Sequence, residues 1–186
     1  MIKLIIIDNY DSFTYNLVHY LEPYCKEITI FRNDEINHDL ISDEHKILLS
    51  PGPGLPSENK ELNYSIEKYH LTNNILGVCL GFQAIGQFFG AELHNLKKVR
   101  HGIQTQIEIL NHDFLFKNVP NNINIGHYHS WVIKNVPKQL KVTALDFENY
   151  AMALRHSDLK ISGIQFHPES ILTDYGKQIL QNWIIS

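Results

Sequence analysis

The sequence has few cysteines, no long apolar run and no cluster of basic residues. Cys25 and Cys79 are the only cysteines among 186 residues, too few for a disulfide framework or for a zinc site with paired Cys-x-x-Cys ligands. The first apolar run, at Lys3–Ile7, is short and ends in acidic and turn-forming residues, unlike a signal peptide or a membrane span. We therefore expect a cytoplasmic chain that makes no membrane contact.

The charge is also unlike that of a nucleic-acid-binding protein. The formal net charge is -4, and the 16 lysines and arginines form no dense run. A chain of this length with 44% hydrophobic residues can bury one sizeable core. Because no internal repeat, low-complexity tract or linker occurs, we expect one domain over residues 1–186. Because no basic cluster occurs, we expect no nucleic-acid partner.

The first half of the chain alternates short runs rich in Ile and Val with helix-like stretches. This pattern predicts an α/β fold with a central, mostly parallel sheet flanked by helices. Ser12 could cap a first helix in which Phe13, Leu17 and Leu21 share one face. The predicted strands are Lys3–Ile7, Glu27–Phe31, Ile47–Leu49 and Ile75–Val78, and the next helices are Asn59–His70 and Phe82–Phe89, the latter ended by Gly90.

The second half changes character, because segments of alternating polarity predict an additional region of mixed or antiparallel strands. A final segment with helical spacing, Tyr175–Ile185, should pack back on the sheet. The predicted strands of this half are Gln104–Ile109, Ile123–Trp131, Lys141–Leu145, Ala151–His156 and Ser162–Phe166.

Cys79 stands at a predicted strand-to-helix junction, within Gly77-Val78-Cys79-Leu80-Gly81. A small residue two positions before and after the cysteine allows a sharp turn that presents the thiol, as in a nucleophile elbow. The N-terminus of the following helix would favour the thiolate. A buried structural cysteine explains the same five residues equally well, so this segment alone leaves both interpretations open.

A possible base and its orienting carboxylate follow the last predicted strand. His167 and Glu169 would point the same way in an extended backbone, so Glu169 could fix the imidazole, although a surface turn with incidental charges is the alternative. The loop Ser50–Gly54 can offer backbone N–H groups to a developing oxyanion. Nucleophile, base, orienting group and oxyanion donors together favour a catalytic site.

Long motifs around these residues resemble the class I (triad-type) glutamine amidotransferases. They occur in the family's order, cover essentially the whole chain, and imply the family's flavodoxin-like architecture. Within the family, Asp8–Asn16 and Tyr128–Ser130 resemble the small subunit (component II) of anthranilate synthase and its relative in aminodeoxychorismate synthase. The motifs are DNYDSFTYNLVHYL, SPGPGLPSE, GVCLGFQAIG, YHSW and GIQFHPES.

The resemblance implies a reaction and a role for each matched residue. Cys79 would attack the side-chain carboxamide of L-glutamine, His167 would protonate the leaving ammonia, and Glu169 would orient His167. Water would then hydrolyse the γ-glutamyl thioester to glutamate. Carried over by position, the backbone N–H groups of the oxyanion hole belong to Gly54 and Leu80, and the glutamine-binding residues are Gly52, Gln83, Ser130 and Trp131.

Two positions depart from the small-subunit pattern, and neither belongs to the triad. Phe82 stands where histidine is usual and should pack, whereas Trp131 stands where leucine is usual and leaves the shape of the glutamine pocket open. His127 and His129 would share one face of a strand, a spacing found among metal ligands. Because the sequence offers no further ligand for them, we predict no metal and no cofactor in this chain.

The first strand is followed by polar residues at the carboxyl edge of the sheet, where α/β folds place ligands and partners. Helix capping explains Ser12 equally well. The residues concerned are Asp8, Asn9, Asp11 and Ser12.

Ammonia released into water would be protonated and lost, so we expect a protein partner that receives it. The resemblance implies a chorismate-using synthase subunit, either anthranilate synthase component I or aminodeoxychorismate synthase component I, with magnesium bound to that partner. The choice between tryptophan and folate biosynthesis then depends on the synthase. Two rival functions are a non-catalytic regulatory subunit, against which the intact triad argues, and a stand-alone cysteine hydrolase, which would act without a partner.

Overall fold

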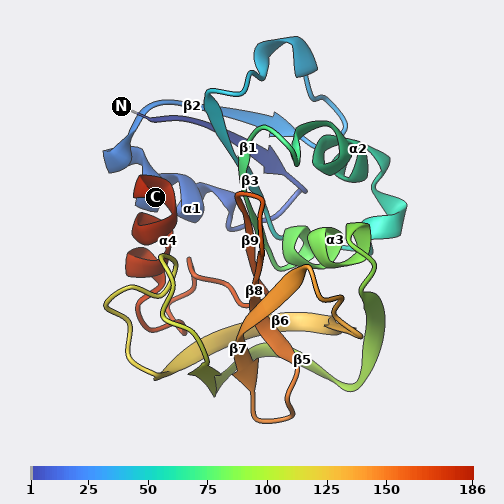
Figure 1. The fold of residues 1–186 in the computed structure, drawn as a ribbon, viewed down its shortest axis with the longest axis vertical. Coiled ribbons are helices and arrows are strands. Elements are labelled where there is room, and N and C mark those ends of the chain that lie inside the picture. The colour runs from blue at the N-terminus through green and yellow to red at the C-terminus, as the bar shows by residue number, and fades with distance from the viewer. Residues whose placement is uncertain (1) are drawn as a thin grey trace.

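The strands of this chain join into one curved, mixed sheet, described over residues 2–186 by a computed structural model (Figure 1). Neighbouring strands are parallel from the first edge to β9 (Ile161–Ile164) and antiparallel from β9 to the other edge. The α/β class, with a parallel region and an additional antiparallel region, is therefore confirmed. The full strand order is β2 (Cys25–Arg32), β1 (Ile2–Asp8), β3 (His45–Leu49), β4 (Asn74–Val78), β9, β8 (Ala151–His156), β7 (Leu140–Asp146), β5 (Glu92–Ile109) and β6 (Asn122–Lys134).

Helices cover both faces of the parallel region, as Figure 1 shows. On one face lie α1 (Thr14–Leu21) and α4 (Gly176–Ile185), and on the other lie α2 (Lys60–Tyr69) and α3 (Leu80–Phe88). Alternate residues of β1 enter the two cores, which explains its continuous apolar run. Short 3-10 helices at η1 (Glu22–Tyr24), η2 (His38–Leu40) and η3 (Pro56–Glu58) connect these elements.

The start of α1 differs from the prediction. Ser12 does not cap this helix, which begins after Phe13 without a side-chain cap. Instead the Asp8 carboxylate accepts hydrogen bonds from the Asp11 backbone N–H at 3.1 Å and from the Thr14 hydroxyl at 2.7 Å. Phe13 therefore lies in the turn, 44% exposed, while Leu17 is buried as predicted. The capping prediction was wrong because a carboxylate from the preceding strand orders this turn.

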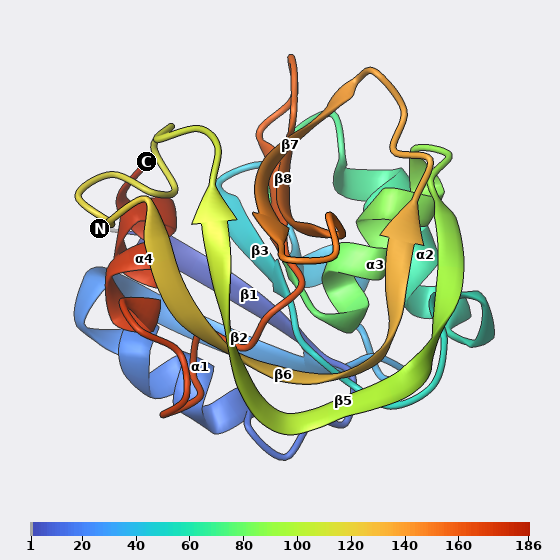
Figure 2. The same ribbon diagram turned by 90° about the horizontal axis from the view of Figure 1, so that it is seen from below.

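Several element boundaries also differ from the sequence prediction. The helix α3 begins at Leu80 rather than Phe82, and β9 ends at Ile164 rather than Phe166. The largest difference is β5, which begins at Glu92 rather than Gln104. Pairing with β6 stabilises residues 92–103 as a strand although their sequence shows no clear alternation. Figure 2 shows the result, a long curved ribbon of β5 and β6.

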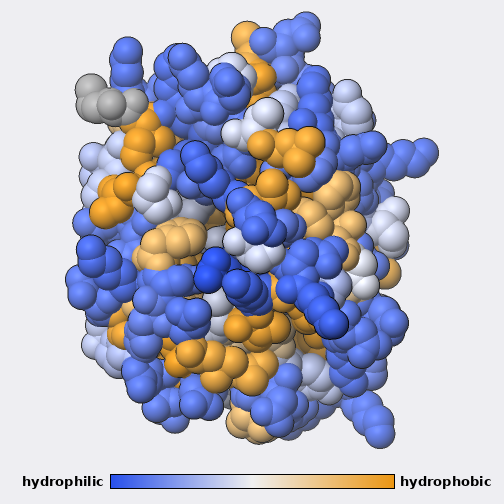
Figure 3. Space-filling model, in the orientation of Figure 1, coloured by the Kyte–Doolittle hydropathy of each residue, from blue (hydrophilic) through white to orange (hydrophobic). Residues whose placement is uncertain are grey.

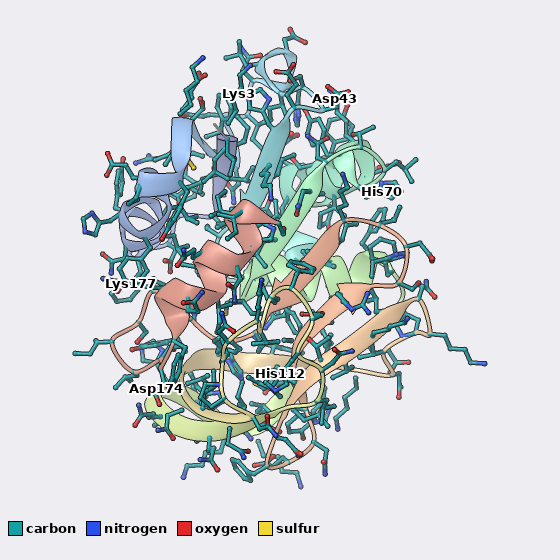
Figure 4. All side chains as sticks on the ribbon, turned by 60° about the vertical axis from the view of Figure 1, so that its left-hand side comes forward. Lys3, Asp43, His70, His112, Asp174 and Lys177 are labelled. Atoms are coloured by element: carbon teal, nitrogen blue, oxygen red, sulfur yellow. The ribbon has the colours of Figure 1, made fainter. Side chains whose placement is uncertain are left out.

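The carboxyl ends of the parallel strands meet at one edge of the sheet, so the segments that follow β1, β3, β4 and β9 come together there. The opposite, amino edge carries Lys3 and Asp43, which lie at the same end of the molecule in Figure 4. On the face drawn in Figure 3, hydrophilic side chains interrupt the hydrophobic ones. Within residues 2–186, no helix is long and apolar enough to cross a membrane.

Candidate active site

Cys79 occupies a sharp turn between β4 and α3. Its backbone has φ 51° and ψ -100°, a conformation that costs a non-glycine residue about 1–3 kcal/mol. The Cys79 N–H donates to the Ile164 carbonyl of β9 at 2.9 Å, and the Cys79 carbonyl accepts from the Gln83 N–H at 3.0 Å. These two hydrogen bonds hold the strained residue at the carboxyl edge of the sheet.

The turn at Cys79 depends on the glycines two positions before and after it. A Cβ on Gly77 would lie 2.5 Å from the Gly81 carbonyl, and a Cβ on Gly81 would lie 2.4 Å from the Leu49 carbonyl oxygen. Both distances are far inside van der Waals contact. Packing therefore requires glycine at both positions of the Gly-x-Cys-x-Gly spacing, because strand and helix approach too closely for any side chain.

The thiol of Cys79 is buried, with 6% of the residue exposed. Gln165, in the segment after β9, directs its side-chain amide to the sulfur at 3.6 Å. The side-chain oxygen of Gln165 accepts a hydrogen bond from the side-chain amide of Gln83 at 3.2 Å. Sequence reasoning missed Gln165, whose position in the GIQFHPES motif was the available signal.

His167 and Glu169 form a buried pair, with 2.6 Å between His167 Nδ1 and Glu169 Oε1. The reason predicted for their pairing was wrong, because the backbone turns here rather than extending. The Ser170 N–H donates to the His167 carbonyl at 3.2 Å and closes that turn, and the Thr173 hydroxyl donates to the same carbonyl at 2.6 Å. The second imidazole nitrogen, Nε2, has no hydrogen-bond partner within residues 2–186.

The surroundings of His167 favour its protonated form. Burial by itself lowers the pKa of this imidazole, but the neighbouring Cys79 sulfur and then the Glu169 carboxylate raise it, and the net pKa lies well above 6.5. The Tyr128 ring packs on the imidazole with 4.8 Å between ring centroids. An imidazolium between a sulfur and a carboxylate is a suitable proton donor for a leaving group.

Asn9 anchors the Ser50–Gly54 loop beside Cys79. Its backbone N–H donates to the Ser50 hydroxyl at 2.8 Å, and its side-chain amide donates to the Ser50 carbonyl at 2.8 Å. Its side-chain oxygen accepts from the amides of Asn33 and Asn59 at 3.1 and 3.0 Å. Asn9 thus connects three loops at the carboxyl edge, a structural role that the sequence had left open.

The two residues predicted to supply oxyanion donors, Gly54 and Leu80, lie beside Cys79. Leu80 is the first residue of α3, so its N–H has no acceptor inside the helix. Gly54 has a φ of +79°, and a Cβ there would lie 2.6 Å from a carboxylate oxygen of Glu58. The loop is closed beyond this point by a 2.8 Å hydrogen bond from the Leu55 N–H to Glu58.

A cavity of about 340 Å³ brings Cys79 together with every predicted oxyanion and glutamine-binding residue. Gln83 contributes to its wall and donates its amide to the Trp131 carbonyl at 2.9 Å. Tyr128 joins the cavity to His167, which together with Glu169 is buried next to it. The lining residues are Cys79, Leu80, Gln83, Gly52, Pro53, Gly54, Leu55, Glu58, Tyr128, His129, Ser130 and Trp131.

A larger cavity, of about 640 Å³, lies away from these residues. Its walls include the first residues of β3 and β4, at His45 and Asn74, which places it at the amino edge of the parallel strands. Asp43 and Ser186 also line it. The larger volume is therefore not evidence for chemistry, which requires the groups gathered at the carboxyl edge.

His127 and His129 share the buried face of β6, as predicted, with 5.1 Å between ring centroids. Burial, followed by the positive charge of Arg100, lowers the pKa of His127 to about 4. Burial also lowers the pKa of His129 well below 6.5. His127 is hydrogen-bonded to Thr105 at 2.6 Å. Residues 2–186 contain no group of three His, Cys, Asp or Glu side chains arranged to hold a metal ion.

Phe82 packs in the core, fully buried, where it lies against Gly163 of β9. A Cβ on Gly163 would lie 2.9 Å from the Phe82 ring. The expectation that this position packs is therefore confirmed.

Comparison with known proteins defines the class. The model of the family "Glutamine amidotransferase class-I" matches residues 5–186, so the chain belongs to the class I glutamine amidotransferases. It is 41% identical to the aminodeoxychorismate/anthranilate synthase component 2 of Bacillus subtilis, over 97% of this chain and 95% of that protein. It is also 41% identical to anthranilate synthase component 2 of Pseudomonas aeruginosa, over 97% of this chain and 94% of that protein.

A solved structure gives the same fold. The glutamine amidotransferase of Thermotoga maritima superposes with a TM-score of 0.74, covering 99% of this chain and 81% of that one. Only 16% of the aligned residues are identical, so the match concerns the fold. The resemblance read from the sequence motifs is thus confirmed for both family and architecture.

Proposed function

We propose that this chain is the glutaminase subunit of anthranilate synthase, which hydrolyses L-glutamine and delivers ammonia to a chorismate-using synthase subunit. The observation that carries the proposal is the cavity in which Cys79 meets the Gly54 and Leu80 N–H groups, with the His167–Glu169 pair beside it. The names of the component 2 relatives support this choice of acceptor.

The first half of the reaction forms a thioester. Cys79 Sγ attacks the side-chain carboxamide carbon of glutamine, and the N–H groups of Gly54 and Leu80 stabilise the oxyanion. When the tetrahedral intermediate collapses, the C–N bond breaks and His167 gives its proton to the leaving ammonia. The raised pKa of His167 suits this step, because the imidazole then begins the reaction protonated.

The second half releases glutamate. His167, now neutral, accepts a proton from a water molecule that attacks the thioester carbonyl, and collapse of the second tetrahedral intermediate breaks the C–S bond and restores Cys79. Glu169 holds the imidazole through Nδ1 in both halves. Gly52, Gln83, Ser130 and Trp131 bind the amino-acid end of glutamine, the last two largely through their backbone groups.

The acceptor chemistry belongs to the partner. We propose that chorismate and magnesium bind to the synthase subunit and that this chain needs no cofactor of its own. A second candidate, the glutaminase subunit of aminodeoxychorismate synthase, is favoured by the Bacillus subtilis relative, whose name includes both activities. Because Cys25 and Cys79 are free thiols, we also propose that the complex works in the cytoplasm.

Reconstitution with each synthase subunit tests the proposal. Wild-type chain should support product formation from chorismate with glutamine, and Cys79→Ser should abolish it while synthesis from added ammonium salts continues. The identity of the product, anthranilate or aminodeoxychorismate, decides between the two candidates. Loss of ammonium-dependent synthesis in the Cys79→Ser complex would contradict the division of labour, and equal activity without any partner would favour a stand-alone hydrolase.

A further inference from the structure

A second groove, of about 580 Å³, lies along β5 and carries a concentration of positive charge. We call it the basic groove. Three of its cations, Lys97, Lys98 and Lys134, have no carboxylate within 4.0 Å among residues 2–186. The whole chain has a net charge of -4, so this groove is opposite in sign to the molecule. The groove is lined by His94, Leu96, Lys97, Lys98, Arg100, Ile103, Thr105, Lys134, Phe147, Glu148 and Tyr150.

Ion pairs and hydrogen bonds connect the residues at the floor of the groove. Arg100 is buried and paired with the carboxylates of Asp146 and Glu148, and its guanidinium lies 5.2 Å from the Phe147 ring centroid and 5.8 Å from that of Tyr150. Asp146 also accepts hydrogen bonds from the backbone N–H groups of Glu148 and Tyr150 at 3.0 and 2.8 Å. Arg100 is thus neutralised inside the protein, while the lysines above it remain available.

Two of the three lysines, Lys97 and Lys98, stand on a bulge of β5, and Lys134 is the last residue of β6. In the pairing of β5 with β6, Asn95 is opposite Trp131 and Arg100 is opposite His129. Residues 96–99 are therefore opposed by Ser130 alone, and Leu96 of this bulge is buried in the core. Lys97, Lys98 and Val99 are all exposed, Val99 by 60%. The bulge thus lies directly across the ribbon from Ser130, which lines the cavity of Cys79.

The rim of the groove is apolar as well as basic. Phe147 is 68% exposed and Ile103 is 40% exposed, and both line the groove beside the lysines. Aromatic side chains are enriched in protein interfaces, and charges that complement a partner's steer the two proteins together.

We propose that the basic groove docks an acidic segment of the synthase subunit. The inference rests on the proposed function, because it assigns a surface to the partner that receives ammonia. Three observations carry it: unpaired lysines on an acidic chain, exposed apolar side chains between them, and the position of the bulge opposite Ser130. Electrostatic attraction at such a site would act mainly on the rate of association.

A protein segment fits the groove better than a nucleic acid does. The groove offers three unpaired lysines within one pocket, whereas nucleic acids bind along a continuous basic path. Glu148, 46% exposed at its side chain, also faces the groove and would repel a phosphate backbone. A partner with carboxylates only at the lysines avoids that repulsion.

The test compares two double charge reversals in complex formation with the synthase subunit. Lys97→Glu/Lys98→Glu alters the groove, and Lys138→Glu/Lys141→Glu makes the same change in net charge at exposed positions outside it. At about 0.05 M salt the groove variant should associate roughly tenfold more slowly than wild type, and its rate should lose most of its dependence on salt. The control variant should behave as wild type, and both should retain the glutamate release of the isolated chain.

The outcomes separate this inference from the proposed function. If wild type binds a synthase and the groove variant associates as fast as the control, the docking site is wrong and the proposed function stands. If wild type binds no chorismate-using synthase, both fail. Salt-dependent binding of a short oligothymidylate that the groove variant loses, or self-association lost in the same way, would overturn the inference in favour of nucleic acid or a second copy.

Discussion

The parallel and antiparallel regions of the sheet build the active site in different ways. The parallel region supplies Cys79 and the Ser50–Gly54 loop, held by backbone contacts so close that glycine is required at Gly77 and Gly81. The antiparallel region supplies Ser130 and Trp131 from a ribbon with a bulge and two buried, uncharged histidines. The position of Cys79, the proposed nucleophile, is thus fixed by main-chain packing, whereas the wall of the cavity depends on side chains.

Substitution of Cys79, at the carboxyl edge of the sheet, should have the largest effect on the rate of glutamine hydrolysis. Cys79→Ser should lower glutamine hydrolysis by about 10⁴-fold or more, because the hydroxyl is a far weaker nucleophile than the sulfur it replaces. Steady-state glutamate release measures this change. The variant should keep the circular dichroism spectrum and the unfolding midpoint of wild type, which controls for folding. Residual activity above a few per cent would argue that another group attacks glutamine.

Glu169→Gln should reduce kcat by about 10²-fold while leaving the fold intact, since the amide keeps a hydrogen bond to His167 but removes the negative charge. The carboxylate is one of the groups that raise the pKa of His167. The imidazole titration, followed by NMR, should therefore move to lower pH in the variant. An unchanged midpoint would show that Cys79 alone sets the charge of His167.

Gly81→Ala sharpens the comparison by testing the main-chain packing of the parallel region. The added Cβ would lie 2.4 Å from the Leu49 carbonyl oxygen, so the variant should lose about 3 kcal/mol of unfolding free energy, measured in urea. Gly102→Ala, in the antiparallel region, is the control. No atom lies within 4 Å of its added Cβ, and the φ of +66° alone should cost about 1 kcal/mol.

The histidines of the antiparallel region should make the protein acid-sensitive. Burial lowers the pKa of His127 to about 4, below its unfolded value near 6.5, so the unfolded state binds the proton first as pH falls. Stability from this group is complete above about pH 6.5 and declines toward about pH 4, by about 2 kcal/mol between about pH 7.5 and pH 5. Urea unfolding across that range measures the slope.

His127→Gln should remove that part of the slope, whereas His112→Gln, at an exposed position, should keep it. Glutamine can still accept or donate at the Thr105 hydroxyl, which limits the overall loss of stability. Identical slopes in wild type and His127→Gln would mean that His127 titrates alike in the folded and unfolded chains.

The smallest effect concerns the turn before α1. Ser12→Ala should change the unfolding free energy by less than about 0.5 kcal/mol, because Ser12 does not cap the helix. Thr14→Val, which removes the 2.7 Å hydrogen bond to Asp8, should cost about 1 kcal/mol. A larger loss from Ser12→Ala than from Thr14→Val would restore the capping role predicted from sequence.

The two regions also differ in how far the sequence predicts them. Buried parallel strands are continuous apolar runs, so β1, β3 and β4 were found within one to two residues of their bounds. The first part of β5 was missed because its pairing with β6, rather than its own pattern, makes it a strand. The pairing of His167 with Glu169 was anticipated although its cause, a turn closed by Ser170, was not.

The sequence did not predict the tertiary contacts of individual side chains. The amide of Gln165 reaches Cys79 and Asn9 connects three loops only because separate strands end at one edge. The bulge at residues 96–99 likewise follows from the register of two strands far apart in the chain. A motif such as GIQFHPES can mark Gln165 as a candidate, but its spacing does not specify which side chain Gln165 contacts.

The central claim is that Cys79 is the nucleophile of glutamine hydrolysis. Mass spectrometry of the chain, quenched in acid during turnover of glutamine, tests it most directly by locating the covalent intermediate. We expect a γ-glutamyl adduct on the peptide that contains Cys79 and no such adduct in Cys79→Ser. Glutamate release that continues in Cys79→Ser, or an adduct on any other residue, would contradict it.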